Sequence, residues 1–146
     1  MDDSVNPTLF DEDDTERLRA ELAMEAAGIG TFDWDLTTGQ LDWDDRLIAM
    51  FGYDPDTFDR SIDGFNARLH PEDLPRVTAA LQTAIDTCGE FQAVYRVVLP
   101  GGETRWVSAR GRTLCDPDGT AVRLLGAASD VTSQHEVDQS VTRVLE

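Results

Sequence analysis

Apolar and polar residues alternate over most of residues 89–132, and this pattern constrains the fold more than any other feature of the chain. The first run, residues 90–99, places four apolar or aromatic side chains on one face: Phe91, Ala93, Tyr95 and Val97. A two-residue repeat of β-branched and aromatic side chains is typical of a strand with a buried face. Residues 103–116 and 121–129 continue the pattern, so the segment predicts three consecutive strands.

Glycine and proline mark the turns between these strands. Pro100-Gly101-Gly102 separates the first two strands, and Asp116-Pro117-Asp118-Gly119 separates the second from the third. Glycine adopts the positive φ that tight hairpins need, and proline suits the early positions of a turn. The third strand contains Gly126-Ala127-Ala128, where small side chains allow a ring or another backbone to come close. Two successive hairpins predict an antiparallel meander.

The N-terminal part of the chain predicts a helix followed by a second hairpin. Residues 1–14 are polar and acidic, and we expect a disordered lead there. An apolar repeat at three- or four-residue steps consists of Leu18, Leu22, Ala26 and Ile29. This repeat predicts a flanking helix over residues 15–28 that stops at Gly28. Residues 30–36 and 40–44 alternate aromatic or aliphatic side chains with polar ones, which predicts two strands.

Helical patterns occupy the middle of the chain. Residues 45–51 and 62–69 predict short helices, and a longer apolar repeat over residues 74–88 predicts a third. Asp73 precedes this longer helix as a candidate N-cap, with Pro75 in the first turn. Five antiparallel strands with helices between the second and third strands predict an α+β domain.

The chain is strongly acidic, with a formal net charge of −17 and no lysine. Nucleic acids and anionic membranes attract cationic surfaces, so this composition argues against both as partners. High solubility or adaptation to salt accounts for such a surface. No apolar run is long enough to span a bilayer, and the acidic N-terminus is unlike a signal peptide. We therefore expect a cytoplasmic protein.

Two cysteines, Cys88 and Cys115, lie far apart in the sequence. Their separation does not fit a CxxC metal or redox motif. We expect both to be reduced and partly buried, acting as small hydrophobic side chains.

Several short stretches form an ordered series between about residues 24 and 132. They are Ala26-Ala27-Gly28-Ile29-Gly30-Thr31-Phe32-Asp33-Trp34-Asp35, Met50-Phe51-Gly52-Tyr53, His70-Pro71-Glu72-Asp73, Tyr95-Arg96, Gly101-Gly102-Glu103-Thr104-Arg105-Trp106-Val107, and Gly126 with Asp130-Val131-Thr132. In this order they resemble the PAS sensor domain of the fold-3 type. The resemblance implies a PAS domain over residues 29–132: a five-stranded antiparallel sheet, short central helices, an N-terminal flanking helix and a C-terminal exit helix.

The resemblance also implies a sensing and dimerising module rather than an enzyme. In such domains the inner face of the sheet and the central helices enclose a small ligand pocket or a packed core. The implied lining residues are Phe32, Trp34, Leu47, Met50, Phe51, Phe65, Leu69, Leu81, Tyr95 and Trp106. Core packing is the alternative for each of them. Tyr95, Arg96 and Arg110 are the polar side chains whose direction separates a ligand sensor from a protein-interaction module.

The end of the last strand corresponds to the exit motif of the family, at Asp130 and Thr132. There the strand continues into a helix that carries the signal onward. Asp130 pairing with Arg105 on the neighbouring strand would couple the sheet to the direction of the exit helix. Capping of that helix by Asp130 is the alternative.

Residues 133–146 predict a linker helix that leads to an effector. Val137, Val141 and Val144 form a coiled-coil seam of about two turns, too short to be stable alone. We expect this seam, together with Leu18 and Leu22 of the flanking helix, to support a homodimer. The chain then represents the N-terminal part of a larger signalling protein, with a PPM-type serine phosphatase, a histidine kinase or a cyclic-dinucleotide enzyme downstream.

Enzymatic activity and tightly bound cofactors have little support in the sequence. His70 lies in a predicted turn and His135 on the exit helix, and neither has the neighbours of a catalytic group. We expect no metal site. The long helix has no histidine to ligate haem, and neither cysteine has the sequence context of a flavin photosensor. The leading interpretation is a relay module with a packed core or a small metabolite in its pocket; non-covalent flavin and, less favoured, haem remain alternatives.

Overall fold

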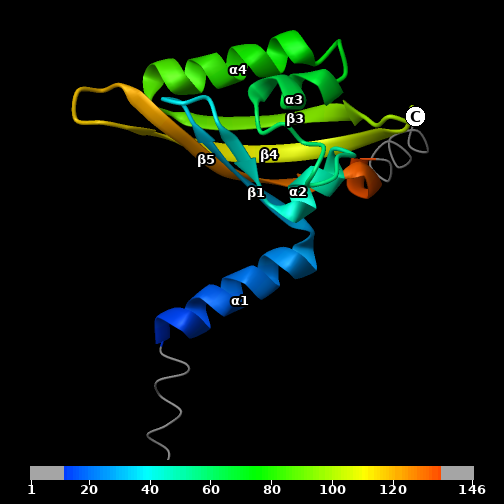
Figure 1. The fold of residues 1–146 in the computed structure, drawn as a ribbon, viewed down its shortest axis with the longest axis horizontal. Helices are drawn as coiled ribbons and strands as arrows, with labels where there is room; N and C mark the ends of the chain where they lie inside the picture. The colour runs from blue at the N-terminus through cyan, green and yellow to red at the C-terminus, as the bar shows by residue number, and fades with distance from the viewer. Residues whose placement is uncertain (1–11, 136–146) are drawn as a thin grey trace, which may run out of the picture.

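The computed structural model describes residues 12–135, which contain a single five-stranded antiparallel sheet (Figure 1). The strands are β1 (Ile29–Asp35), β2 (Leu41–Trp43), β3 (Glu90–Val98), β4 (Thr104–Cys115) and β5 (Ala121–Asp130), and their order in the sheet is β2-β1-β5-β4-β3. β3, β4 and β5 form the predicted meander. β1 pairs with β5, so the β1–β2 hairpin extends the meander and all five strands form one sheet. The α+β fold predicted from the sequence is confirmed.

Between β2 and β3 the chain forms helices that pack against the sheet: α2 (Asp45–Met50), α3 (Ile62–Arg68) and α4 (Leu74–Thr87). In Figure 1, α3 and α4 lie above the sheet while α2 lies near its right-hand end. Asp44 caps α2 because its carboxylate accepts a hydrogen bond from the Leu47 backbone N–H at 3.0 Å. Ser61 caps α3 through the backbone N–H of Gly64 at 3.4 Å. These caps fix where the short helices begin, although the helices are too short to be stable on their own.

The alternation in β3 matches the two faces of the sheet. Phe91, Ala93, Tyr95 and Val97 are buried beneath the helices, as the sequence pattern predicts. In β4 the buried positions include Val107, Ala109 and Thr113, and in β5 they are Leu124 and Ala128. The core therefore lies between the inner face of the sheet and the three helices.

A close approach at Gly126 explains the small residues of β5. Gly126 pairs with Phe32 of β1 on one side and with Gly111 of β4 on the other. A Cβ atom added at Gly126 would overlap the Phe32 ring and the backbone of Arg110. Glycine at this position thus lets the Phe32 ring lie flat over the sheet and contribute to the inner layer.

The two cysteines form a disulfide between Cys88, just after α4, and Cys115, at the end of β4. The expectation that they are reduced is therefore wrong. The fold brings their Cα atoms to 6.1 Å across a sequence separation of 27, which is within the usual span of a disulfide. Sequence spacing alone carried no sign of this pairing, because it depends on how α4 packs on β4.

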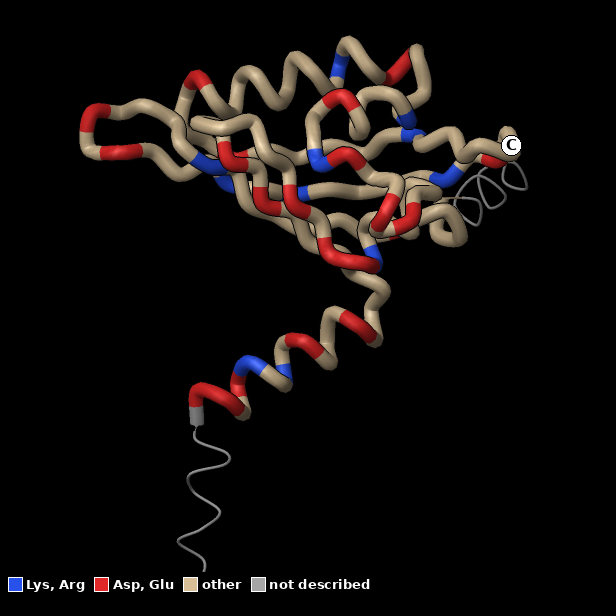
Figure 2. The backbone as a smooth tube through the Cα atoms, in the orientation of Figure 1, with Lys and Arg blue, Asp and Glu red and all other residues tan. Residues whose placement is uncertain are grey.

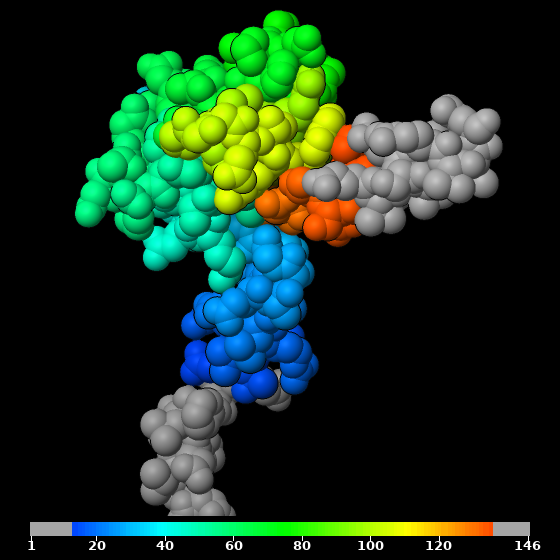
Figure 3. All heavy atoms as spheres, turned by 90° about the vertical axis from the view of Figure 1, so that its right-hand side faces the viewer, coloured from blue at the N-terminus to red at the C-terminus, as the bar shows by residue number. Residues whose placement is uncertain are grey.

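An N-terminal helix, α1 (Glu12–Ala27), extends away from the domain in Figures 1 and 3. It begins three residues before the predicted start at Thr15 and ends before Gly28, which has a φ of +68°. Arg46 joins its end to the domain, since its Nε donates to the Ile29 carbonyl at 2.7 Å and its Nη1 lies 3.8 Å from Glu25. Among the described helices, none is long and apolar enough to cross a membrane.

Candidate functional site

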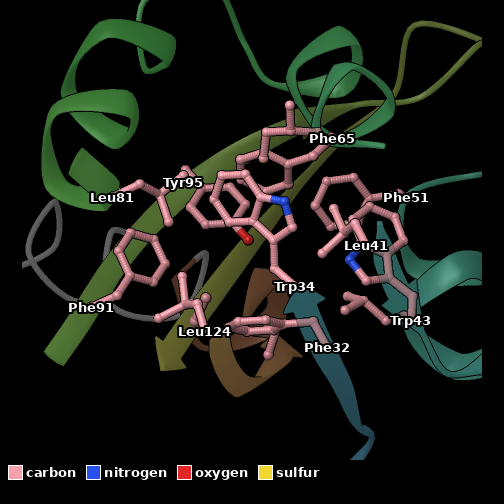
Figure 4. Close-up of a pocket in the computed structure, with 14 residues that line it drawn as sticks. Phe32, Trp34, Leu41, Trp43, Phe51, Phe65, Leu81, Phe91, Tyr95 and Leu124 are labelled. Atoms are coloured by element: carbon pink, nitrogen blue, oxygen red, sulfur yellow. The ribbon is translucent and has the colours of Figure 1, made fainter. Parts of the chain in front are cut away.

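A small cavity lies inside the core, between the inner face of the sheet and the helices (Figure 4). Its volume is about 40 Å³. By comparison, roughly 10–15 Å³ of such space is enough for one water molecule. The lining side chains are Phe32, Trp34, Leu41, Trp43, Leu47, Phe51, Ile62, Phe65, Leu81, Phe91, Tyr95, Ala109, Leu124 and Ala128. None of these carries a charge, so the cavity favours neutral, mostly apolar contents.

Three polar groups belong to the lining side chains: the indole nitrogens of Trp34 and Trp43 and the hydroxyl of Tyr95. The indole Nε1 of Trp34 is buried and has no hydrogen-bond partner among the described residues. Tyr95 is only 2% exposed, and no hydrogen bond from its hydroxyl joins it to the described part of the chain. In Figure 4 the Trp34 ring and the Tyr95 hydroxyl both lie in the middle of the lining side chains. Burial raises the pKa of Tyr95 above its ordinary value, so the hydroxyl keeps its proton.

The structure brings together seven of the ten residues proposed as a pocket lining: Phe32, Trp34, Leu47, Phe51, Phe65, Leu81 and Tyr95. Met50 and Leu69 are buried in the core but do not line the cavity. Leu41, Trp43 and Phe91 line it without having been proposed. The alternation within their strands gave a usable signal, because each lies on the face that carries other apolar side chains.

Trp106 lies on the opposite face of the sheet, which corrects its assignment to the pocket. The register pairs Tyr95 with Val107 and Arg96 with Trp106, so Val107 points into the core and Trp106 points out. The Trp106 ring stacks on His135 with centroids 3.8 Å apart, and the Arg96 guanidinium lies 5.5 Å from its centre. Trp106 therefore contacts the exit segment instead of the cavity.

The end of β5 forms a compact hydrogen-bonded junction. Asp130 accepts hydrogen bonds from the backbone N–H of Thr132 at 2.9 Å and from its hydroxyl at 2.5 Å. The same hydroxyl accepts the backbone N–H of Trp106 at 2.9 Å. Residues 132–135 then form a short helical turn. The Thr132 side chain thus connects β4, the end of β5 and the start of the exit helix.

Arg105 connects this junction to α2. Its Nη1 donates to the carbonyl oxygens of Ala49 and Met50 at 3.2 and 2.9 Å. These carbonyls lie at the end of α2, where unpaired carbonyl groups favour a cation. The Nε of Arg105 is 3.9 Å from Asp130, a longer contact between side chains that are 36% and 39% exposed. Asp130 thus bonds the first residue of the exit helix and lies within ion-pair distance of Arg105.

A stronger charged pair, which sequence reasoning did not find, joins Asp73 to Arg96. Asp73 occupies the N-cap position of α4 but makes no side-chain capping bond, contrary to expectation. Its carboxylate instead accepts the Arg96 backbone N–H, Nε and Nη2 at 2.8, 3.0 and 2.7 Å. These hydrogen bonds to Arg96 lower the pKa of Asp73 to about 2. The tertiary structure alone reveals this role of Asp73, because Arg96 is distant from it in the sequence.

The remaining candidate residues have diverse environments. Arg110 is exposed on the outer face of the sheet, away from the cavity. His70 lies in the turn before α4, where its Nδ1 accepts the Glu72 backbone N–H at 3.1 Å. Leu18 and Leu22 of α1 are 49% and 55% exposed. Val137, Val141 and Val144 lie outside the described residues.

Sequence comparison identifies the family once this geometry is known. The family model of the PAS fold matches residues 40–128, more than half of the chain. The chain belongs to the PAS family. The matched segment contains α2, α3, α4 and most of the sheet, which together enclose the cavity. A PAS domain is generally regulatory rather than catalytic.

Similar proteins include signalling proteins from several bacteria. The sensor protein FixL of Bradyrhizobium diazoefficiens is 32% identical over 126 residues, which cover 86% of this chain and 25% of that protein. The probable diguanylate cyclase DgcE of Escherichia coli is 24% identical over 84% of this chain and 11% of its own length. The chain therefore spans a quarter or less of these curated relatives.

A solved structure supports the same fold. The sensory box histidine kinase/response regulator of Burkholderia thailandensis is 30% identical, with a TM-score of 0.72, over 86% of this chain and 93% of that one. PAS domains in such proteins are attached to effector domains. The chain is accordingly a sensory-type domain of signal transduction.

Proposed function

We propose that this PAS domain binds a small neutral molecule in its core cavity and relays occupancy through Arg105 and Thr132 to a C-terminal effector. The observation that carries the proposal is the buried Trp34 Nε1, which has no hydrogen-bond partner among the described residues and belongs to a side chain that lines the apolar cavity together with Tyr95. Buried polar groups in folded proteins normally have partners, and their absence costs about 1–3 kcal/mol each. A ligand with a hydrogen-bond acceptor would satisfy the indole N–H.

The shape of the cavity favours a compact ligand. A cavity of about 40 Å³ has room for a few water-sized groups. A tricyclic flavin or a haem would require the aromatic side chains to move apart, which argues against both alternatives. The uncharged lining also disfavours carboxylates and amines, because desolvating a charge is costly without a counter-charge. A small neutral ketone or aldehyde meets these requirements, and a six-membered ring such as cyclohexanone would fit once the lining side chains move apart slightly.

The route from the cavity to the exit segment runs through direct contacts. Leu47 and Phe51, in and just after α2, line the cavity. The end of α2 accepts hydrogen bonds from Arg105, and the adjacent Trp106 donates its backbone N–H to Thr132. A ligand that shifts α2 would therefore change the contacts of the exit turn. These contacts run without a break from the cavity to the exit turn and support the relay. A measured effect of ligand binding on the exit turn would test it.

The partners in this proposal are a second copy of the chain and a covalently attached effector. Among the effector classes expected from sequence, similar proteins are named as histidine kinases and a diguanylate cyclase. We propose an effector of one of these two classes in place of a PPM-type phosphatase. Leu18 and Leu22 on α1 offer exposed apolar contacts for a homodimer.

Indole N–H resonances provide a direct test of ligand binding. Cyclohexanone, a neutral probe with one acceptor, is titrated into the isotopically labelled protein and compared with benzene and benzoate. We expect the Trp34 indole signal to move with cyclohexanone, and a smaller shift of the Trp106 signal, whose ring stacks on His135, would report the relay to the exit turn. Benzene should bind more weakly because it lacks the acceptor, and benzoate should not bind.

Matched variants locate the binding site. Trp34→Phe and Tyr95→Phe each remove one polar group and keep an aromatic ring, and each should weaken cyclohexanone binding by about 2- to 10-fold. Trp106→Phe is the control and should leave binding unchanged. Equal binding by benzoate, or no response at Trp34 with any neutral probe, would contradict the proposed ligand class.

A further inference from the structure

The Cys88–Cys115 disulfide lies where α4 ends and β3 begins, and both of these elements contribute residues to the cavity wall. Leu81 of α4 and Phe91 of β3 both line the cavity, and Cys88 lies between them in the chain. The disulfide connects this junction to the end of β4. The bond therefore holds together the two elements that close this side of the core.

Hydrogen bonds also hold this junction. The Thr113 hydroxyl donates to the Ala84 carbonyl at 3.1 Å, and its backbone N–H donates to Gly89 at 3.0 Å. Between α4 and the core, only Val77 and Ala84 of the helix are fully buried. Without the covalent bond, the last turn of α4 would depend on these contacts, on the backbone N–H groups of Cys88 and Gly89 that donate to the end of the helix, and on the pairing of β3 with β4.

The backbone conformation of Cys88 favours opening of the end of α4 once the disulfide is broken. Cys88 has a φ of +53°, in the left-handed region that glycine or asparagine usually occupies at the end of a helix. A side chain at such a position carries conformational strain, which the surrounding contacts must offset. Both cysteines are only half-buried, so a reductant can reach the bond from solvent.

We propose that Cys88 and Cys115 form a redox-sensing site whose reduction loosens the end of α4 and opens that side of the cavity. A dithiol reductant breaks the S–S bond by thiol–disulfide exchange. The two cysteines gain two electrons and two protons and become thiols, while the dithiol becomes a disulfide. A small disulfide such as oxidised glutathione reverses the reaction by accepting those electrons. The chain would thus respond to thiol redox state independently of any cavity ligand.

The first test follows the thiols of the folded, full chain. Thiols are counted with a chromogenic disulfide reagent after treatment with dithiothreitol in the absence of denaturant, and again after oxidised glutathione. We expect two thiols per chain after reduction and none after reoxidation. A bond that resists dithiothreitol until the protein is unfolded would overturn the proposal and leave the disulfide as a structural cross-link.

The second test measures local opening by hydrogen exchange. Reduction should raise exchange at residues 84–91 by about tenfold or more, since even part of the stabilisation expected for a closed loop of this length exceeds that factor. Exchange in β1 and β2, far from the disulfide in the chain, should not change. Unchanged exchange at residues 84–91 in a fully reduced, folded protein would overturn the proposal.

Variants separate reduction from other effects of the reagent. Cys88→Ser/Cys115→Ser should match the exchange of the reduced protein and should not respond to dithiothreitol. If this variant does not fold, the chemically reduced wild-type chain still gives the decisive comparison.

The opening of the cavity rests on the proposed function, but the redox reaction does not. Cyclohexanone should enter and leave the reduced protein faster. If this probe fails to bind in either state while exchange still responds to reduction, the ligand proposal is wrong and the redox site stands.

Discussion

At the scale of single residues, Asp73 is held by a specific set of contacts to arginine side chains. Its side chain is 8% exposed and accepts three hydrogen bonds from Arg96. A further contact from Arg76 lies at 3.6 Å. Because one of the Arg96 donors is its backbone N–H, the pair fixes the start of α4 against β3 as well as pairing two charges.

The Asp73 contacts predict a specific dependence of stability on pH. The pKa of Asp73 falls from 3.8 to about 2 on folding, so its carboxylate stabilises the fold above about pH 4 and loses this effect as pH falls towards about 2. Asp73→Asn should lower the free energy of unfolding by about 2 kcal/mol at neutral pH. The difference from wild type should shrink below about pH 4 in urea unfolding experiments.

Asp56→Asn is the matched control for this substitution, because Asp56 is exposed. Its effect should be small and should not follow the same pH profile. A constant difference between Asp73→Asn and wild type over the whole acid range would show that the charge of Asp73 does not matter.

At the scale of elements, the exit junction depends on one hydroxyl. Thr132 accepts from the backbone of β4 and donates to Asp130 at the end of β5. Its position explains how the start of the exit helix, described over residues 132–135, is held against the sheet. His135 adds an aromatic contact to Trp106.

Thr132→Val removes this hydroxyl and keeps the shape of the side chain. We expect amide exchange at residues 131–135 to rise by about 2- to 10-fold, the factor that corresponds to the loss of a typical hydrogen bond. Hydrogen exchange followed by NMR measures the effect. Ser133→Ala removes a hydroxyl from the same turn and should change exchange much less; equal effects of the two variants would argue against a special role for Thr132.

At the scale of the whole molecule, the two main features are the high negative charge and the N-terminal helix α1, which extends from the domain. The chain carries a net charge of −17, and Figure 2 shows acidic residues recurring along α1 and on the domain. α1 has six carboxylates and two arginines, yet it exposes Leu18 and Leu22 on one side. Self-association through α1 therefore sets apolar burial against repulsion between like charges.

This balance predicts a dimer that strengthens with salt. Raising sodium chloride from about 0.1 to about 1 M shortens the screening length from about 10 to about 3 Å and should favour the dimer in sedimentation equilibrium. Leu18→Gln/Leu22→Gln should raise the dissociation constant by about tenfold or more, because it removes two apolar contacts per chain. Ala20→Gln/Ala23→Gln, on the other side of α1, is the control. A monomer under all conditions would contradict the dimer proposal.

The sequence by itself determined the elements and half of the residues that line the cavity. Side chains alternate between the two faces of a strand, so a two-residue apolar repeat marks one face as buried. This pattern placed Phe32, Trp34, Phe91 and Tyr95 on the inner face of the sheet. Gly126 was identifiable as a point of close approach, although its partner, the Phe32 ring, was not. The helix boundaries also followed, apart from the earlier start of α1.

Tertiary structure decided the contacts between residues distant in the chain. The register of β3 against β4 turned Trp106 outward, and the packing of α4 on the sheet paired Cys88 with Cys115. Asp73 bonds Arg96 instead of capping its own helix, because β3 brings the arginine within reach. These outcomes depend on strand register and helix placement, which are set by the energy of the whole packed core and are not encoded in any local pattern.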